Sequence, residues 1–389
     1  MKIKDVAVTR LSWGRRPERL DSGAAKTGTG PGWERSAAFV QIFTDEDITG
    51  ISLAENRKET DGIIEGPLKN QIVGEDPFDV EKLWYKMFVH WRKPVAAGEH
   101  LLYSCISAID NAIWDIIGKA TNQPLYKLLG CFNNKITCYA AGGHYKKGKT
   151  PQDLANEMKT YVGMGFRAVK MKIGRTSIEK DTERIKAVRE AIGDDITLMI
   201  DANNAYSSAN IAIKMAKAAA KYHPYWFEEP LYPDDRDGWL EVKRFCNAEG
   251  IAVAGGENEF TRWGCREFIQ RRCVDIFQAD AGTAGGITEW KKMAALCSAN
   301  HIAVSPHGDP WTHAHLVAHA PTGEYNEVHM FRQYMYDLIP AIPVKDGYQD
   351  VQSYMTKPGL GIEINKEEWD VHVEGQKIPD YIPRETEVD

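Results

Sequence analysis

The chain has 389 residues, of which 43% are hydrophobic and 26% charged, a composition typical of a globular protein that buries a sizeable core. Its length allows two modest domains, or one barrel of about 250 residues with an added domain. The formal net charge of -7 argues against nucleic acid as the main partner. We also expect no membrane partner, because no apolar run approaches the ~20 residues of a transmembrane helix.

The cysteines point to a reducing compartment. There are seven of them, scattered along the chain without a Cys-x-x-Cys pair. This usage favours free thiols over a disulfide framework or a structural zinc site. Residues 1–10 alternate like a strand and lack the apolar core of a signal peptide. We therefore expect a cytoplasmic protein.

The first third of the chain is predicted to form a separate α+β domain, because strands come first and helices follow. A glycine-rich stretch, residues 14–33, interrupts the strands and is expected to be either disordered or a functional lid. Helical periodicity begins at Pro67 and continues to Gly130, with its strongest pattern over residues 101–120. The predicted strands are residues 3–11, 37–44 and 47–54.

From Lys135 onward, short apolar strands alternate with helical segments at spacings of roughly 20 to 30 residues. Such alternation predicts a parallel sheet, and eight units predict a closed (β/α)8 barrel. Residues 359–365 are expected to form a further strand that returns to the first domain. The predicted barrel strands are residues 135–141, 168–173, 197–201, 225–228, 251–255, 274–279, 302–305 and 324–329.

Ionisable residues mark the ends of these strands in phase with the repeat. Lys170 and Lys172 share one strand face, because side chains alternate with period 2. In a barrel the carboxyl ends of the strands converge on one mouth, where catalytic groups sit. Carboxylates gathered there repel each other unless a cation holds them. The following strands end at Asp201, Glu228, Glu257, Asp280, His307 and Glu327.

Three of these carboxylates offer a metal site. Asp201, Glu228 and Glu257 follow three successive strands and supply only oxygen ligands. Hard oxygen ligands without nearby sulfur suit Mg²⁺, with Mn²⁺ as the next expectation. The neighbours Glu229 and Glu259 are rival donors, since adjacent residues on a strand point to opposite faces.

Asp280 and His307 arise from the next two strands and suit general acid/base work, because an aspartate that binds one ring nitrogen fixes the histidine tautomer. His313, His315 and His319 form a separate cluster on a predicted helix. No carboxylate or cysteine accompanies them at ligand spacing within that helix, so we interpret them as a helix face near the mouth and not as a second metal site. Lysines on one side of a metal and an Asp-His pair on the other suit the removal of a proton next to a carboxylate.

At these residues the chain resembles the enolase superfamily and, within it, the mandelate racemase subgroup. The resemblance implies a modified (β/α)7β barrel over residues 131–343, with a capping domain formed by residues 1–130 and the tail 344–389. It also implies a homo-oligomer. The motifs that carry it are Ser107-Ala-Ile-Asp-Asn-Ala-Ile-Trp-Asp, Lys170-Met-Lys, Asp201-Ala-Asn, Glu228-Glu-Pro, Gly256-Glu-Asn, Asp280 ahead of Gly285-Gly-Ile-Thr, Ser305-Pro-His and Pro358-Gly-Leu-Gly.

The resemblance also implies a role for each residue of the mouth. Lys172 would be the base on one face, with Lys170 lowering its pKa by like-charge repulsion and contacting the substrate carboxylate. His307 with Asp280 would be the acid/base on the other face, and Glu327 would hydrogen-bond the carboxylate as it becomes enolic. The implied ligands of one Mg²⁺ are Asp201, Glu228 and Glu257.

These roles predict a lyase that dehydrates a small acid sugar, an aldonate or aldarate, to a 2-keto-3-deoxy acid. Candidate sugar contacts are Asn203, Arg92, Lys93 and His144, and residues 14–33 and 53–56 are expected to close over the substrate. One alternative is a racemase or epimerase of a 2-hydroxy acid that uses the same two bases. A remote alternative is a sugar-acid binding protein without catalysis.

Overall fold

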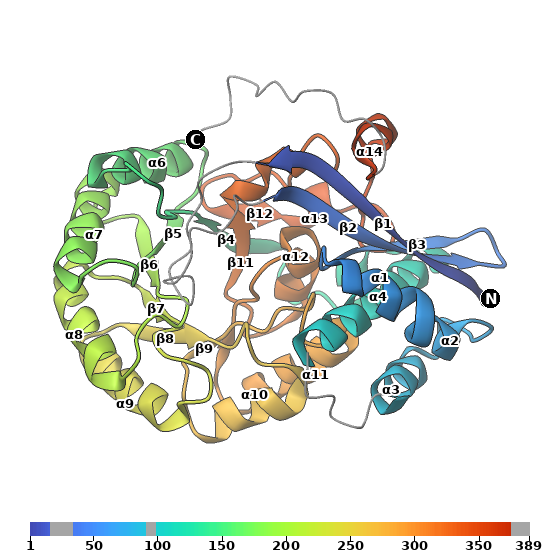
Figure 1. Ribbon diagram of the computed structural model, residues 1–389, viewed down its shortest axis with the longest axis horizontal. Coiled ribbons are helices and arrows are strands. Elements are labelled where there is room, and N and C mark those ends of the chain that lie inside the picture. Colours follow the sequence, from blue (N-terminus) through green and yellow to red (C-terminus); the bar gives the residue numbers. More distant parts are fainter. Residues whose placement is uncertain (16–33, 91–98, 375–389) are drawn as a thin grey trace.

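The computed structural model describes residues 1–15, 34–90 and 99–374, and Figure 1 shows a barrel beside a smaller sheet. The barrel strands run parallel in the order β10-β9-β8-β7-β6-β5-β4-β11. Backbone hydrogen bonds from Val304 N to Thr322 O and from Glu324 N to Val304 O, both 2.9 Å, join the two ends of this order. The strands are β4 (Lys135–Ala141), β5 (Ala168–Lys172), β6 (Thr197–Asp201), β7 (Trp226–Glu228), β8 (Ala252–Gly255), β9 (Ile276–Phe277), β10 (Ala303–Val304) and β11 (Tyr325–His329).

One helix follows each barrel strand except the last, which leads into the 3-10 turn η4 (Met330–Met335). The barrel alternation predicted from the sequence is therefore confirmed in its modified (β/α)7β form. No helix in the described parts of the chain is long and apolar enough to cross a membrane. The helices are α6 (Pro151–Gly163), α7 (Ile178–Ile192), α8 (Ala209–Ala219), α9 (Arg236–Ala248), α10 (Thr261–Gln270), α11 (Gly286–Ala299) and α12 (Pro310–His319).

Local chemistry sets where these helices begin. Thr150 and Asp153 form a capping box ahead of α6, and the Ser177 side chain caps α7. Asp309 caps α12, whose first residue is Pro310. Such side chains satisfy backbone N–H groups that the helix itself leaves unpaired. These caps fix the first residues of α6, α7 and α12.

The first part of the chain folds into an antiparallel sheet, β1 (Ile3–Arg15), β2 (Glu34–Thr44) and β3 (Thr49–Ala54), as predicted. Helices α3 (Val80–His90) and α4 (Glu99–Ala120) follow. The chain turns helical earlier than Pro67, because helical turns already begin at Lys58. These turns are α1 (Lys58–Ile63), η2 (Ile64–Leu68), which contains Pro67, and α2 (Lys69–Ile72).

Helix α4 is bonded to the start of α11 through polar side chains that satisfy the first N–H groups of that helix. The close approach requires glycine at 286, whose φ is 85° and where a Cβ atom would lie 2.5 Å from Asp110 Cβ. This junction fixes the first sheet and its helices to the barrel. The bonds run from Gly285 N to Ser107 Oγ (2.8 Å), from Ile287 N to Asn111 Oδ1 (2.9 Å) and from Thr288 N to Asp110 Oδ2 (2.8 Å).

The prediction of a strand at residues 359–365 is wrong. Gly359 forms an isolated bridge to Pro124, and the positive φ angles of Gly359 and Gly361, 74° and 65°, break the extended conformation. The tail instead adds β12 (Tyr348–Asp350) to β4 and the short helix α13 (Val351–Tyr354). It then reaches β1 through α14 (Lys366–His372), in accord with the expected return to the first sheet (Figure 1).

Candidate active site

Two buried lysines of β5 lie at the centre of the barrel mouth, where each meets carboxylates from other strands. Lys170 Nζ lies 2.6 Å from Glu228 Oε1 and 2.8 Å from Glu327 Oε1. Lys172 Nζ lies 2.5 Å from Asp201 Oδ2. The lysines are only 1% and 7% exposed. Ion pairs of this kind offset part of the cost of burying an ammonium group.

The strand register explains why these groups meet. Lys172 pairs with Asp201 across β5 and β6, and Asp201 pairs with Glu228 across β6 and β7. Glu228 Oε2 accepts hydrogen bonds from Trp226 Nε1 (3.0 Å) and Gln278 Nε2 (2.9 Å). The two carboxylates thus stand next to each other at the ends of neighbouring strands.

The structure separates the rival carboxylates that the sequence left open. Glu229 adopts a φ of 41° and accepts a hydrogen bond from Asn258 Nδ2 (2.7 Å). Glu259 pairs with Arg236 at 2.8 Å. Glu257, in contrast, keeps a buried oxygen, Oε2, that has no hydrogen bond in the described part of the chain. Glu229 and Glu259 are thus each held by one polar side chain, and Glu228 and Glu257 stay the predicted ligands.

Asp280 and His307 form the expected pair, with His307 Nδ1 3.2 Å from Asp280 Oδ2. Burial lowers the pKa of His307, but Glu257, Glu327 and Asp280 outweigh it and raise that pKa to about 10. For Asp280, burial raises the pKa, and the bonds to His307 and His313 outweigh it and hold the pKa well below its usual range. The pair consequently carries a tightly held proton at the edge of the mouth.

The other histidines of α12 face different partners. His313 Nε2 accepts a hydrogen bond from Ala281 N at 3.0 Å and lies 3.3 Å from Asp280 Oδ1, so this ring stands beside the aspartate. His315 accepts a hydrogen bond from Tyr126 N at 3.1 Å, and His319 Nδ1 lies 3.0 Å from Gly130 O. The expectation of a helix face near the mouth therefore holds for His313, whereas the other two point to segments outside it.

The pKa of Lys172 differs from the expectation that Lys170 would lower it. Burial lowers the pKa of Lys172, as does Lys170, but Asp201, Glu257 and Glu228 together raise it above its ordinary value. Burial also lowers the pKa of Lys170, which Glu228 and Glu327 raise well above its usual range. Burial and Asp201 together raise the pKa of Glu228 to about 8. Like-charge repulsion between the lysines is present, as predicted, but the adjacent carboxylates are stronger.

The donor set fits a hard divalent cation. Asp201, Glu228 and Glu257 supply only oxygen atoms, and they come from three consecutive strands of the barrel. Asp201 and Glu228 repel each other's charged forms, and Glu257 Oε2 is buried without a hydrogen bond. A cation that prefers oxygen ligands would offset the repulsion between Asp201 and Glu228 and would give Glu257 Oε2 a partner. The assignment of these three residues as metal ligands stays a prediction.

His329 is a residue of the mouth that the sequence reasoning missed. It follows Glu327 by two positions on β11, so both side chains lie on the same strand face. Its ring lies 5.3 Å from the ring of His307 and is 5% exposed. The alternation that singled out Lys170 and Lys172 could have found it.

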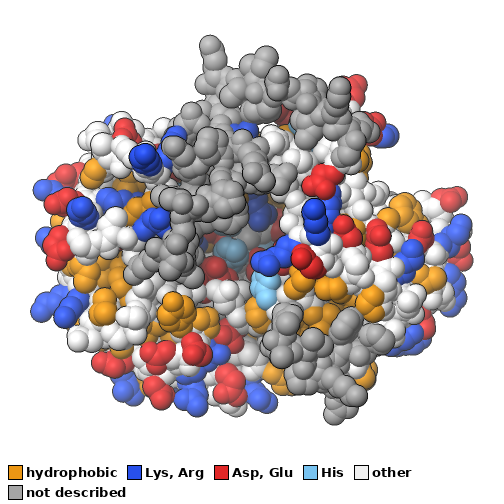
Figure 2. All heavy atoms as spheres, in the orientation of Figure 1, with side chains coloured by type: hydrophobic (Ala, Val, Ile, Leu, Met, Phe, Trp, Pro, Cys, Tyr) orange, Lys and Arg blue, Asp and Glu red, His pale blue; other side chains and the backbone are white. Residues whose placement is uncertain are grey.

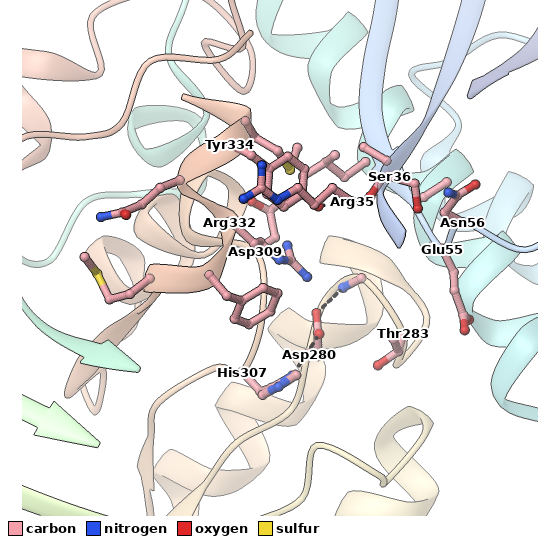
Figure 3. Close-up of a pocket in the computed structure, with 18 of the residues that line it drawn as sticks. Arg35, Ser36, Glu55, Asn56, Asp280, Thr283, His307, Asp309, Arg332 and Tyr334 are labelled. Atoms are coloured by element: carbon pink, nitrogen blue, oxygen red, sulfur yellow. Dashed lines mark hydrogen bonds and ion pairs between the residues drawn. The ribbon is translucent and has the colours of Figure 1, made fainter. Parts of the chain in front are cut away.

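A cavity of about 1030 Å³ lies between the mouth and the first sheet. In Figure 3, His307 and Asp280 occupy one side of it, and Arg35, Arg332 and Tyr334 lie across from them. Figure 2 shows histidine and Lys/Arg side chains gathered around the hollow on this face. The cavity therefore connects the Asp-His pair to a basic wall supplied by β2 and η4.

The predicted substrate contacts have different outcomes. His144 lines the cavity. Asn203 donates its backbone N–H to Asp201 Oδ1 at 2.8 Å and is absent from the described lining, so the structure gives it a role in holding that aspartate. Arg92 and Lys93 lie outside the described residues.

The two segments expected to close over the substrate also differ. Residues 53–56, which follow from β3, line the cavity on the side of the first sheet. Gly14 is described within β1, and residues 16–33 lie outside the described residues. The wall seen in the structure is therefore built by residues 53–56 together with the barrel loops.

Comparisons with known proteins agree with this architecture. Residues 10–130 match the family described as mandelate racemase / muconate lactonizing enzyme, N-terminal domain, and residues 153–369 match the enolase C-terminal domain-like family. Arabinonate dehydratase of Saccharolobus solfataricus is 35% identical, over 93% of this chain and 96% of that enzyme. A 3,6-anhydro-alpha-L-galactonate cycloisomerase of Streptomyces coelicolor is 33% identical, over 78% and 81%.

Solved structures show the same likeness. A racemase from Streptomyces coelicolor A3(2) with bound magnesium superposes with a TM-score of 0.84 at 28% identity. The superposition covers 95% of this chain and 99% of that one. The two family matches together span most of the chain, and the superposition covers both the barrel and the first sheet. The chain belongs to the mandelate racemase and muconate lactonizing enzyme family of the enolase superfamily.

Proposed function

We propose that the protein is a magnesium-dependent dehydratase of a small acid sugar, an aldonate or aldarate, and that its product is a 2-keto-3-deoxy acid. One observation carries the proposal. Lys172 Nζ lies 2.5 Å from Asp201, and His307 Nε2 lies 3.6 Å from Glu257. Two groups that can exchange protons thus contact different carboxylates of the proposed metal site, and His307 with Asp280 also lines the cavity. A base on one side and an acid on the other suit the removal of a proton and of a neighbouring hydroxyl.

Asp201, Glu228 and Glu257 would hold the cation. Magnesium bound there would neutralise the substrate carboxylate and stabilise the negative charge that develops on it during proton removal. The magnesium in the related racemase structure supports this assignment, with Mn²⁺ as the second expectation. Lys170 would face the same substrate carboxylate as a fixed positive charge, since Glu228 and Glu327 keep it protonated.

The chain's own residues would move the protons. Lys172 Nζ would take the proton from the carbon next to the carboxylate in its neutral form. That form becomes accessible when a cation binds Asp201 and removes that carboxylate's hold on the ammonium group. His307 Nε2 gives a proton to the β-hydroxyl, which leaves as water, while Asp280 holds Nδ1 and so fixes the ring. Glu327 hydrogen-bonds the carboxylate as it becomes enolic. The resulting enol then tautomerises to the 2-keto acid.

The relatives support this class of substrate. The two enzymes described above are named for acting on arabinonate and on an anhydrogalactonate. A racemase or epimerase of a 2-hydroxy acid is the second candidate, favoured by the related racemase structure. It would use Lys172 and His307 to exchange the same proton between two faces.

A screen of aldonates and aldarates with saturating magnesium tests the proposal. We expect at least one compound to give a 2-keto-3-deoxy acid, and a chelator to abolish that activity until magnesium is restored. The same screen in D2O separates the candidates. Deuterium uptake with inverted configuration and an unchanged carbon skeleton, without keto acid, would establish the epimerase and reject the dehydratase.

We also propose the division into a capping domain, residues 1–130 with 344–389, and a catalytic barrel, residues 131–343. The apolar clusters support it in part, since α3 and α4 pack on one face of the first sheet, whereas Leu11, Phe39 and Ile51 of that sheet join the barrel cluster. The strand β12 departs from this division, because it belongs to the tail assigned to the capping domain but pairs with β4 of the barrel. The cytoplasmic location and the homo-oligomer stay predictions.

A further inference from the structure

We propose that the barrel mouth holds a second metal site, selective for zinc and similar transition-metal ions, formed by His307, Glu327 and His329. This site is distinct from the all-oxygen set of Asp201, Glu228 and Glu257. Its occupation would block the ring nitrogen of His307 that faces the cavity, so zinc would act as an inhibitor.

Geometry is the first argument. The three side chains each offer a donor atom, and these atoms all lie within 4.8 Å of one another. His329 Nε2 lies 3.2 Å from Glu327 Oε2, and His307 Nε2 lies 3.9 Å from the same oxygen. Ligands around a tetrahedral zinc ion stand roughly 3.3 Å apart, because each lies about 2.0 Å from the metal. Small side-chain movements therefore suffice to bring the three donors onto one ion.

His329 supplies the second, independent observation. Its side chain is 5% exposed, and among the described residues neither ring nitrogen makes a hydrogen bond of acceptable geometry. Buried polar groups without partners are rare in native proteins and call for an explanation. The ring stands beside His307, 5.3 Å between centroids, and beside Phe331, 4.8 Å. A metal ion on one nitrogen would satisfy it.

The other two ligands are already oriented by their neighbours. Asp280 binds Nδ1 of His307, which leaves Nε2 for a metal, and a carboxylate–histidine–metal arrangement of this kind raises ligand basicity. Gly308 N donates a hydrogen bond to Glu327 Oε2 at 3.0 Å, and Lys170 binds the opposite oxygen at 2.8 Å. Glu327 is thereby fixed with one oxygen toward the histidines.

Charge and ligand chemistry favour two different ions at the mouth. Two imidazoles and one carboxylate suit zinc, cobalt, nickel or copper, whereas the all-oxygen set suits magnesium. A metal on His307 must displace the proton of that ring. With His307 neutral, one divalent cation and the two lysines leave the mouth with a formal charge of about −1, so a second cation is not repelled by the group as a whole. The carboxylates in this balance are Asp201, Glu228, Glu257, Asp280 and Glu327.

Cobalt provides a direct test, because four-coordinate Co²⁺ absorbs visible light far more strongly than six-coordinate Co²⁺. We would titrate Co²⁺ into the wild-type chain in excess magnesium and displace it with Zn²⁺. We expect one strongly absorbing Co²⁺ per chain. His329→Gln should weaken its binding by about 100-fold, and Asp280→Asn by about 10- to 100-fold.

His319→Gln is the matched control, since His319 binds Gly130 O away from the mouth, and it should leave cobalt binding unchanged. The proposed site would be rejected if bound Co²⁺ gave nothing but the weak absorption of a six-coordinate ion. It would also be rejected if His329→Gln bound Co²⁺ as tightly as the wild-type chain does. X-ray absorption of the zinc-loaded, magnesium-saturated wild-type chain needs no variant. It should show two imidazole ligands, and a shell without imidazole would reject the proposal.

Inhibition by zinc rests on the proposed function, because it requires His307 to act as the acid, but the metal site does not. If zinc binds through two imidazoles but the protein forms no keto acid, the dehydratase is rejected and the metal site is supported. If the protein forms keto acid, zinc does not inhibit it and the bound zinc has no imidazole ligand, the zinc site is rejected and the dehydratase stands.

Discussion

Lys172 Nζ lies 2.5 Å from Asp201 Oδ2, so the proposed base and one proposed metal ligand bind each other at the mouth. Burial lowers the pKa of Lys172, but Asp201, together with Glu257 and Glu228, raises it above its ordinary value, so the lysine stays protonated. An ammonium group and a divalent cation therefore compete for the same carboxylate. Metal binding and the protonation of the base are linked through this one contact.

Replacing the lysine should strengthen magnesium binding. In Lys172→Met the competing cation is absent and Asp201 is released, so we expect magnesium to bind about 10-fold more tightly, or about 1.4 kcal/mol. Isothermal titration measures the change. Lys186→Met is the control, because Lys186 is an exposed residue 3.7 Å from Glu190 on α7. Equal or weaker magnesium binding in Lys172→Met would contradict the competition.

The two glutamates of the Gly256-Glu-Asn-Glu segment should behave differently. Glu257→Gln removes a proposed ligand and should weaken magnesium binding by at least about 10- to 100-fold. Glu259→Gln alters a carboxylate that pairs with Arg236 at 2.8 Å and should leave magnesium affinity within about threefold. Calorimetry on both variants provides the comparison. A larger loss in Glu259→Gln than in Glu257→Gln would reverse the assignment.

The junction between α4 and α11 should depend on Gly286. In Gly286→Ala the new Cβ meets Asp110 Cβ at 2.5 Å with φ at 85°, and we expect a loss of about 3 kcal/mol in the free energy of unfolding. Gly250→Ala has a similar φ of 74° but no atom within 4 Å, so about 1 kcal/mol should be lost. Urea unfolding measures both. Equal losses would show that the contact with Asp110 costs nothing.

Acid should weaken the fold through His315. Burial lowers the pKa of His315 from 6.5 to about 4. Between these values the unfolded chain binds a proton that the folded chain does not, so stability falls as the pH falls from about 6.5 to 4. The contribution is at most about 3 kcal/mol, at 1.4 kcal/mol for each pH unit. His315→Gln should lack this component in urea unfolding at several pH values, and an unchanged pH dependence would refute it.

Much of the barrel could be predicted because its signals are local and periodic. The strand predicted at residues 197–201 matches β6 at both ends, and the strand predicted at residues 135–141 likewise matches β4. Charged residues at the strand ends, such as Asp201 and Glu228, follow the same repeat. Convergence of those ends is a property of the fold, so their meeting at one mouth follows from spacing alone.

Other features depend on the three-dimensional arrangement and escaped prediction. Spacing left Glu228 and Glu229 open as ligands, because it does not reveal the left-handed φ of Glu229, and the family resemblance alone named Glu228. The balance of charges on Lys172 depends on the distance to Asp201, which spacing does not supply. The false strand at residues 359–365 arose because alternating apolar residues outweighed two glycines whose φ angles are positive.

The central claim is tested most directly by mass spectrometry of acid sugars incubated with magnesium and the wild-type chain, with Lys172→Met in parallel. We predict that a member of the panel loses one water to form a 2-keto-3-deoxy acid. We also predict that Lys172→Met slows this reaction by at least about 100-fold, although it binds magnesium more tightly. Water loss at an equal rate in Lys172→Met, or α-proton exchange with inverted configuration and no water loss by the wild-type chain, would contradict the account.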